Sequence, residues 1–295
     1  MAEIVLFSDS SCDLFPNIIK EYPINLIPFY VSFESEIYLK ANEEISLQEF
    51  YKKLRVPHTF PKTSLPSIND YCEHFRPVLA AGNAVICLCL SSKFSGSYAA
   101  AVNAKDILLD EFPNAKIEII DSEAATGQQG LIVLETAMMI KDGLSFEEVA
   151  RVAKLIRADS RIFFYVDTLE YLEKGGRIGK VSAFLGGMLN IKPVICLKEG
   201  ELFPIAKVRG KKKAAEKVAA SLAEYIAGRE DQFNYAIAHA DAAEDLRHLE
   251  DIILNKLNIP LMYDDMEIGT TIGVYTGPDV CGTACVPKYQ QYLKH

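Results

Sequence analysis

The sequence contains no apolar run of the roughly 18 to 20 residues that a helix needs to span a bilayer. It also lacks a surplus of basic residues, since 40 acidic and 31 basic side chains leave a formal net charge of -9. Proteins that hold nucleic acid or an anionic membrane through charge need a basic surface, so both classes are disfavoured. A signal peptide is not expected either, because Glu3 and Asp9 stand where a basic and then a long apolar segment would be needed. We therefore expect a globular protein of the cytoplasm.

Motifs for metal binding and for nucleophilic catalysis are also missing. The five histidines form no pair at ligand spacing, and several of the seven cysteines lie within apolar runs, as reduced and buried thiols do. The glycine-rich basic loop that starts at Lys174 has Lys174 and Val181 where a phosphate-binding loop needs Gly and then Ser or Thr. No Gly-x-Ser-x-Gly motif for a hydrolase serine occurs. We expect neither a metal nor a cofactor.

Short apolar runs alternate with amphipathic stretches in the first half of the 295 residues, which is typical of a parallel sheet covered by helices. Strands are expected at residues 4–7, 24–33, 84–90 and 117–120, and helices after Ser46, Ser67 and Ser145 and over residues 98–109. Ser46 with Glu49 and Ser145 with Glu148 match the capping box, in which a hydroxyl and a carboxylate satisfy free backbone N–H groups at a helix start.

The second half has a different pattern, with consecutive strands. Strands are expected at residues 162–166, 192–197, 201–209 and 235–239 and within 268–275, and helices over 181–189, 211–227 and 242–255. Glu199-Gly200 reads as a hairpin turn, which implies a mixed sheet. The sequence therefore predicts an α/β protein of two domains. Residues 1–158 form a three-layer α/β/α domain with a parallel sheet, and residues 159–295 form a two-layer α/β domain with a mixed sheet.

Hydroxyl-bearing residues accumulate beyond the ends of the predicted strands. Serines surround Asp9 after the first strand, four further serines fall within residues 91–97 after the most buried strand, and Thr63 and Ser64 precede a helix. The carboxyl ends of parallel strands face one crevice, where ligands bind, so we expect these runs to converge. A single serine is more often a helix cap, but several converging runs favour a site for a carboxylate or phosphate group.

The segment at residues 181–189 is apolar on every face of the helix expected there. Such a helix lies either in the core or in the wall of an apolar cavity. The core is the more common case, and two adjacent glycines and Met188 add support for the cavity, because small and adaptable side chains leave room for a chain.

A series of motifs extends along the chain. The motifs are Phe-Ser-Asp-Ser-Ser-Cys-Asp-Leu at 7–14, Thr-Ser-Leu-Pro-Ser at 63–67, Leu-Ser-Ser-Lys-Phe-Ser-Gly-Ser-Tyr at 90–98, Val-Asp-Thr-Leu-Glu-Tyr-Leu at 166–172 with Gly-Gly-Arg-Ile-Gly at 175–179, Leu-Asn-Ile-Lys-Pro at 189–193, Val-Arg-Gly at 208–210 and Tyr-Thr-Gly-Pro at 275–278. In these motifs and in their order the chain resembles the DegV family, and the motifs cover essentially the whole chain.

The resemblance implies a bacterial protein that encloses one long-chain fatty acid in a tunnel between its two domains. It implies that the protein is not itself an enzyme: it presents the carboxylate to a separate ATP-dependent fatty acid kinase subunit, which forms an acyl phosphate for phospholipid metabolism. Transient contact with a membrane would allow ligand exchange. The matching positions give the carboxylate ligands as Thr63, Ser64, Ser95, Ser97 and Tyr275, and give Arg177 and Arg209 as basic residues that support the kinase step.

Three positions depart from the family pattern. Ser97 stands for a threonine and keeps the hydroxyl. Tyr275 stands for a histidine; it can donate a hydrogen bond but carries no positive charge near neutral pH. Asp279 stands for a glycine and brings a negative charge into a loop where glycine would allow positive φ.

Two other functions remain open from the residues. A small-molecule phosphotransferase or hydrolase would use the converging serines and Asp9 directly, with Arg177 neutralising a phosphate; the missing phosphate loop weighs against it. A regulatory lipid sensor would bind the same ligand but change only its affinity for a partner. A tightly held acyl chain in the purified protein would separate the lipid-binding functions from the first alternative.

Overall fold

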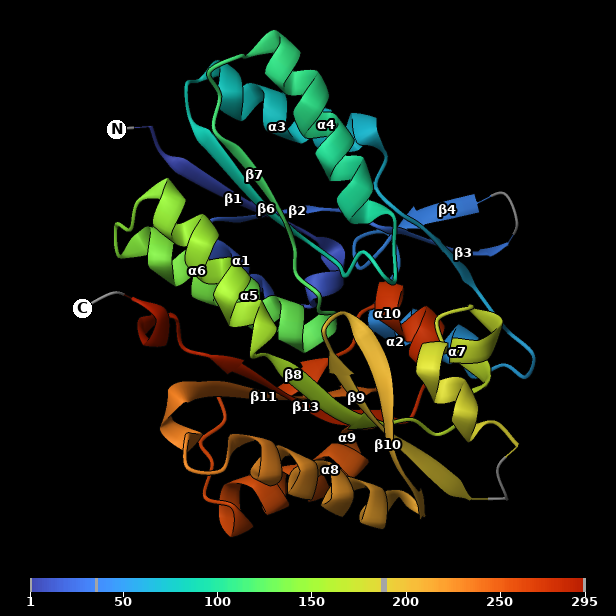
Figure 1. Cartoon of the computed structure of the whole chain (residues 1–295). Helices are drawn as coiled ribbons and strands as arrows, with labels where there is room; N and C mark the ends of the chain where they lie inside the picture. The colour runs from blue at the N-terminus through green and yellow to red at the C-terminus, as the bar shows by residue number, and fades with distance from the viewer. Residues whose placement is uncertain (1, 35–36, 187–189, 294–295) are drawn as a thin grey trace.

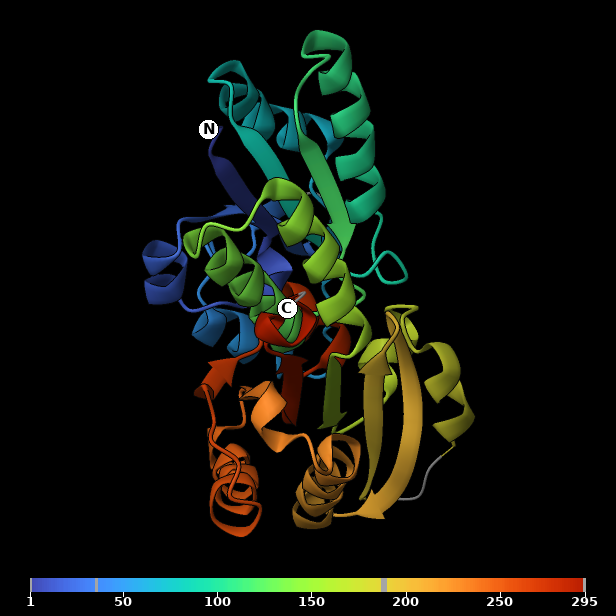
Figure 2. The same cartoon turned by 60° about the vertical axis from the view of Figure 1, so that its left-hand side comes forward.

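The computed structural model describes residues 2–34, 37–186 and 190–293. The strands form a four-stranded, a six-stranded and a three-stranded sheet. In Figure 1 the four-stranded sheet lies in the upper half with helices on both faces, and the six-stranded sheet lies below it. Figure 2 shows that the first-half elements and most second-half elements occupy opposite ends of the molecule, while the red C-terminal segments reach the middle.

The first sheet is parallel and has the order β2-β1-β6-β7. Its strands are β1 (Ile4–Asp9), β2 (Ile24–Ile27), β6 (Ala84–Cys89) and β7 (Ile117–Asp121). One face packs against α3 (Ile68–Ala80) and α4 (Ser97–Glu111), and the other against α1 (Pro16–Glu21), α5 (Thr126–Lys141) and α6 (Phe146–Ala158). Strand β6 is buried along its whole length, as its unbroken apolar run requires. The predicted three-layer arrangement is confirmed.

Serine caps begin three of these helices as predicted. Ser145 forms a complete capping box with Glu148 at α6, and Ser67 forms one with Asp70 at α3. Ser46 accepts a hydrogen bond from the Glu49 N–H at the start of α2 (Leu47–Leu54). The Glu49 carboxylate lies instead 3.0 Å from the Lys53 ammonium, so the structure gives α2 only half of the predicted box.

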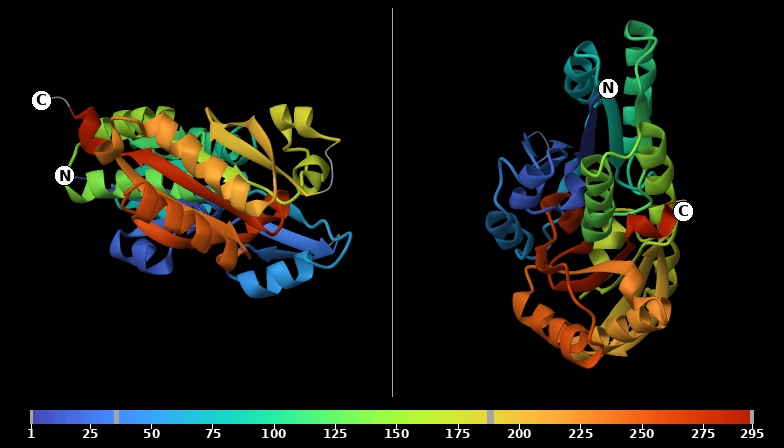
Figure 3. Two further views of the ribbon diagram at one scale, coloured as in Figure 1. Left: turned by 90° about the horizontal axis from the view of Figure 1, so that it is seen from below. Right: turned by 90° about the vertical axis from the view of Figure 1, so that its left-hand side faces the viewer.

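The second sheet is mixed and has the order β10-β9-β8-β13-β11-β12. Its strands are β8 (Arg161–Tyr165), β9 (Ile191–Lys198), β10 (Glu201–Arg209), β11 (Phe233–Ala240), β12 (Tyr263–Glu267) and β13 (Val280–Pro287). Only β11 and β12 run parallel among these pairs. Helices α8 (Lys211–Ile226) and α9 (Ala243–Asp251) cover one face, as the view from below shows in Figure 3. This confirms the predicted two-layer domain with a mixed sheet.

Helix α5 lies between the two sheets. Nearly all of its residues are buried, and it packs against β1 on one side and against β11 and β13 on the other. The C-terminal turn at Tyr289–Tyr292 also returns to the first half, because the Tyr289 N–H donates to the Glu135 carboxylate on α5 over 2.6 Å. The predicted domain boundary falls between α6 and β8. The contacts of α5 and of the C-terminal turn join the two sides of this boundary.

The third sheet was not predicted and has the order β4-β3-β5. Its strands are β3 (Tyr30–Glu34), β4 (Ile37–Lys40) and β5 (Lys62–Ser64), all antiparallel. Strand β5 carries Thr63 into the centre of the molecule, where it lies opposite Val31.

The strand predicted within residues 268–275 is wrong, because the structure has helix α10 (Thr270–Thr276) there. Thr270, Thr271, Ile272 and Val274 are β-branched and suggest a strand, but tertiary packing decides the conformation. A Cβ at Gly273 would lie 2.8 Å from the Phe50 ring and 2.9 Å from the Tyr51 hydroxyl, so the helix can pack only through a glycine. The last strand is β13, and β12 was also missed.

The helix predicted at residues 181–189 is wrong for the described part, which forms the 3₁₀ turn Gly179–Phe184. Gly179 and Gly186 have positive φ, which interrupts an α-helix. Val181 is buried, but Leu185 is 40% exposed, so the segment forms no all-apolar core helix. Residues 187–189, which the prediction also covered, lie outside the described residues.

The remaining elements are short, and the cysteines are unpaired. These elements are α7 (Glu170–Lys174), the 3₁₀ turns at Ser10–Cys12 and Glu230–Gln232, and the π turn at Ile252–Lys256, which continues α9 along the predicted helix. All seven cysteines are buried and free. Among the helices that the structure describes, none has the length and apolar character to cross a membrane.

Candidate functional site

A cavity lies between the first half of the chain and the inner face of the mixed sheet. Its walls come from β5, the turn after β6, the start of α5, five strands of the mixed sheet and α10. The cavity has a volume of about 130 Å³, roughly ten times the space that one buried water needs. Most lining side chains are apolar, so the cavity suits an apolar ligand better than water.

The floor of the cavity is built from small residues on β11 and β13. Ala236 lies opposite Ala284 in the antiparallel register, and Ala238 lies opposite Gly282. Ala238 is half-buried although its strand has a neighbour on each side, because its side chain faces the cavity. Small side chains on two neighbouring strands leave a groove above the sheet that can accept an extended chain.

Four polar side chains meet at one end of the cavity. The hydroxyls of Thr63 on β5 and Tyr275 on α10 lie 2.6 Å apart in a hydrogen bond. Ser95, in the turn between β6 and α4, also lines the cavity, as does Arg177. The structure therefore brings together Thr63, Ser95, Tyr275 and Arg177, whose motifs lie far apart in the chain.

Arg177 carries the only formal charge among the described residues that line the cavity. Its Nε donates to the Phe94 carbonyl over 3.1 Å, and its Nη1 donates to the Gly175 carbonyl over 2.7 Å. The guanidinium lies 4.8 Å from the centre of the Tyr275 ring. These contacts fix Arg177 while leaving donors on its guanidinium for an anion.

Two glycines let α7 and α10 approach each other closely. A Cβ at Gly175 would overlap the Tyr275 ring, and a Cβ at Gly277 would overlap the Tyr171 ring. Each helix thus contributes a tyrosine that packs on a glycine of the other segment. This packing holds the Tyr275 ring beside Thr63 and Arg177.

The other predicted site residues lie elsewhere. Ser64 is exposed and Arg209 is exposed at the end of β10, and neither lines the cavity. Ser97 is fully buried, and its hydroxyl donates to Asp9 over 2.8 Å and lies 2.6 Å from the Tyr71 hydroxyl. Ser97 therefore contacts the Asp9 carboxylate and does not line the cavity.

The serine runs do converge, but most of their hydroxyls serve Asp9 and the backbone around it. The Asp9 carboxylate is fully buried and accepts hydrogen bonds from the Ser11 and Ser97 hydroxyls, the Leu90 N–H and the Gln129 amide. Burial raises the pKa of Asp9, and these four hydrogen bonds oppose that rise. The network ties the ends of β1 and β6 to α4 and α5, so it supports the cavity wall without entering the cavity.

Sequence reasoning missed the floor of the cavity and a second buried carboxylate. Alternating alanines in Phe233–Ala240 were the available signal for the floor, because three successive positions on one face of the strand are alanine. The two carboxylate oxygens of Asp13 are buried and lie beside Gly269, next to α10. Their burial raises the pKa of the carboxyl to about 7.

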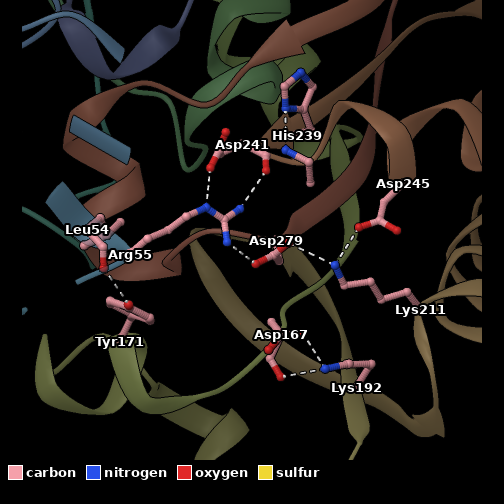
Figure 4. A network of polar contacts seen from close by, with 11 residues as sticks. Leu54, Arg55, Asp167, Tyr171, Lys192, Lys211, His239, Asp241, Asp245 and Asp279 are labelled. Atoms are coloured by element: carbon pink, nitrogen blue, oxygen red, sulfur yellow. Dashed lines mark hydrogen bonds and ion pairs between the residues drawn. The ribbon is translucent and has the colours of Figure 1, made fainter. Parts of the chain in front are cut away.

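A network of ion pairs lies outside the cavity, beyond the C-terminal end of α10 (Figure 4). Arg55 contacts the carboxylates of Asp241 and Asp279, and Lys211 contacts those of Asp245 and Asp279. Although burial opposes it, hydrogen bonding to Arg55 and Lys211 lowers the pKa of Asp279. Asp279 has a φ of 63°, so it adopts the left-handed conformation that glycine would favour and that aspartate tolerates.

Across residues 2–34, 37–186 and 190–293 no group of three or more His, Cys, Asp or Glu side chains is placed to hold a metal ion. The polar end of the cavity instead combines neutral hydroxyl donors with one guanidinium. Such a set binds an anionic oxygen by hydrogen bonds and charge.

Comparison with known proteins gives consistent results over nearly the whole chain. The model of the DegV family, described as "Uncharacterised protein, DegV family", matches residues 3–288. A DegV domain-containing protein of Clostridium acetobutylicum is 34% identical over 288 residues, which are 96% of this chain and 97% of that protein.

Two solved structures are also similar. A stearic acid-binding protein of Eubacterium ventriosum has a TM-score of 0.92 and 33% identity, with 99% of this chain and 100% of that chain covered. A DegV family protein of Thermus thermophilus, whose structure is described in terms of fatty acid binding, has a TM-score of 0.88 and 31% identity over 97% of this chain and 99% of that one.

Proposed function

The chain belongs to the DegV family, and we propose that it binds one long-chain fatty acid in the cavity between its two halves. The observation that supports this most is an apolar cavity in which Arg177, at one end, is the one charged side chain among the described lining residues. A fatty acid has the matching form, an anionic head and a long apolar tail. The fatty acids named for the similar proteins of Eubacterium ventriosum and Thermus thermophilus support the same ligand class.

In this proposal the carboxylate lies among Thr63, Ser95, Tyr275 and Arg177, and the tail runs over the small residues of β11 and β13. Hydroxyls and a guanidinium can donate to both carboxylate oxygens, which lowers the cost of removing the charge from water. Ser97 bonds to Asp9 and Ser64 is exposed outside the cavity, so neither is a carboxylate ligand in this proposal. A direct hydrolytic role for the serines is less well supported, because Asp9 and neighbouring backbone groups already engage most of their hydroxyls.

Organic extraction of the denatured protein should release about one long-chain fatty acid per chain. Each buried methylene contributes about 0.8 kcal/mol, so a long tail should stay bound through purification. Native mass spectrometry of the protein as purified, before and after feeding with stearic acid, measures the occupancy. Protein that remains free of lipid after feeding, or that carries only a water-soluble ligand, would contradict the proposal.

We also propose that the chain presents the bound carboxylate to a separate ATP-dependent kinase subunit, which forms the acyl phosphate. The chain itself then catalyses nothing, and the basic residues Arg177 and Arg209 support the transfer by stabilising developing negative charge. Arg177 lines the cavity, whereas Arg209 lies outside it. Arg209 can therefore act only on the kinase or on the transferred phosphoryl group.

Substitution Arg209→Ala should leave the bound fatty acid in place and abolish acyl phosphate formation with a cognate kinase subunit. The physical reason is that Arg209 is exposed and makes no contact with the cavity. Bound lipid is measured by extraction and acyl phosphate by trapping with hydroxylamine. Lys207→Ala, an exposed lysine on the same strand, is the matched control. Normal acyl phosphate formation with the Arg209 variant would show that Arg209 is a surface charge without a role in the kinase step.

A further inference from the structure

The segment that follows α10 connects the polar end of the cavity to the ion network outside it. Tyr275 faces the cavity, and Asp279 follows it after a turn made by Gly277 and Pro278. Gly277 has a φ of 72° and Asp279 a φ of 63°, so the turn has one defined and unusual backbone conformation. The Asp279 N–H donates to the Ala240 carbonyl over 2.8 Å.

The carboxylate of Asp279 joins two segments that come from different halves of the chain (Figure 4). Its Oδ2 accepts from Arg55 Nη1 over 2.9 Å, at the C-terminal end of α2. Its Oδ1 accepts from Lys211 Nζ over 2.9 Å, at the start of α8. Arg55 also donates through Nη2 to the Asp241 carbonyl over 2.9 Å, so its guanidinium cannot turn away without losing several bonds at once.

The same end of α2 contacts the turn from a second direction. The Tyr171 hydroxyl donates to the Leu54 carbonyl over 3.3 Å, and the Tyr171 ring covers Gly277. Leu54 and Arg55 thus hold the turn through Tyr171 on one side and through Asp279 on the other. A change in the turn would move Tyr275, because only Thr276 and Gly277 separate that residue from Pro278.

We propose that Asp279 is a positioning residue for the head-group site, because its ion pairs with Arg55 and Lys211 hold the turn after α10 and thereby keep the Tyr275 hydroxyl beside Thr63. This inference rests on the proposed binding of a fatty acid carboxylate at Tyr275. Asp279 itself does not line the cavity.

A positioning role and a stabilising role predict different results. The side chains of Arg55, Lys211 and Asp279 are 42%, 31% and 24% exposed, and ion pairs that solvent reaches contribute little to folding stability. The position of Tyr275 affects only the carboxylate of the ligand. The ratio of affinities for stearic acid and for methyl stearate isolates that effect, because both ligands share the same tail.

Substitution Asp279→Asn removes the charge and keeps a side chain that tolerates the left-handed conformation. We expect the acid-over-ester ratio to fall about three- to tenfold, while the unfolding midpoint moves by no more than about 3 °C. Arg55→Lys should lower the ratio in the same way, because one ammonium cannot engage Asp241 and Asp279 as a guanidinium does.

Asp245→Asn is the matched control, because Asp245 pairs with Lys211 but does not lie on the turn. Its acid-over-ester ratio should equal that of the wild type. An unchanged acid-over-ester ratio in Asp279→Asn would overturn the positioning role while leaving fatty acid binding intact. An equal fall of the ratio in Asp279→Asn and Asp245→Asn would also overturn the positioning role. Wild-type protein that binds neither stearic acid nor its ester would overturn the proposed function together with this inference.

Discussion

Replacing Thr63 by valine and Ser95 by alanine in one variant should lower the affinity for stearic acid by about a hundredfold or more. Each hydroxyl that donates to a buried carboxylate contributes roughly 1.5 to 3 kcal/mol, and each 1.4 kcal/mol corresponds to about tenfold in affinity. Valine keeps the shape of Thr63 and removes only its hydroxyl. Affinity is measured by titration of delipidated protein with stearic acid and with methyl stearate.

The same variant tests the simpler role of these hydroxyls as caps. The Ser95 hydroxyl accepts from the Ser97 N–H over 3.1 Å at the start of α4, so its loss should cost about 1 kcal/mol of folding stability. If capping were the whole role, the unfolding midpoint would fall while the affinity and the acid-over-ester ratio stayed constant. Ser64→Ala is the matched control, because Ser64 neighbours Thr63 but is exposed and outside the cavity. An unchanged ratio in the double variant would place the head-group site elsewhere.

Substitution Ala238→Phe should reduce the affinity for stearic acid by about two hundredfold. The added ring has about the volume of four methylenes and projects from the floor of β11 into the cavity. Each displaced methylene forfeits about 0.8 kcal/mol of burial, which gives roughly this loss in affinity. The free energy of unfolding of the lipid-free protein should stay constant or rise, because the ring fills space that is open in the cavity.

Two comparisons make this result specific. Decanoic acid has a shorter tail and should lose less affinity than stearic acid in the same variant. Ala99→Phe places the same ring on the exposed face of α4 and should leave both affinities unchanged. Full stearic acid affinity in folded Ala238→Phe protein would show that the tail does not run over this strand.

The parts of the fold that could be predicted are those that local sequence patterns determine. Strand β6 has an unbroken apolar run because both faces of the parallel sheet are covered, and Ser145 with Glu148 begins α6 through short-range hydrogen bonds. Residues 270–276 show the limit of this reasoning. Their β-branched side chains favour a strand, and only the contact of Gly273 with Phe50 and Tyr51 explains the helix.

The site was predictable as a set of hydroxyls but not as a geometry. Ser95 and Ser97 are two residues apart, yet one lines the cavity and the other bonds to Asp9, because α4 begins between them. Nothing in the local pattern distinguishes these two positions. The role of the alanines of β11 and β13 as the cavity floor could not be predicted either, because it depends on whether other side chains fill the space above them.

Helix α5, which lies between the parallel and the mixed sheets, makes the two halves one cooperative unit. Its inner faces belong to a hydrophobic core that contains residues of β1 and β6 as well as residues of β8 and β13. If the two halves separated, the apolar side chains of α5 that pack on the other half would be exposed to water, which is unfavourable. A chain cut at residue 158 would keep α5 but expose the side that packs on β11 and β13. Parting the two halves would expose the same apolar surface, so a movement confined to the edge of the cavity costs less burial than separation of the halves.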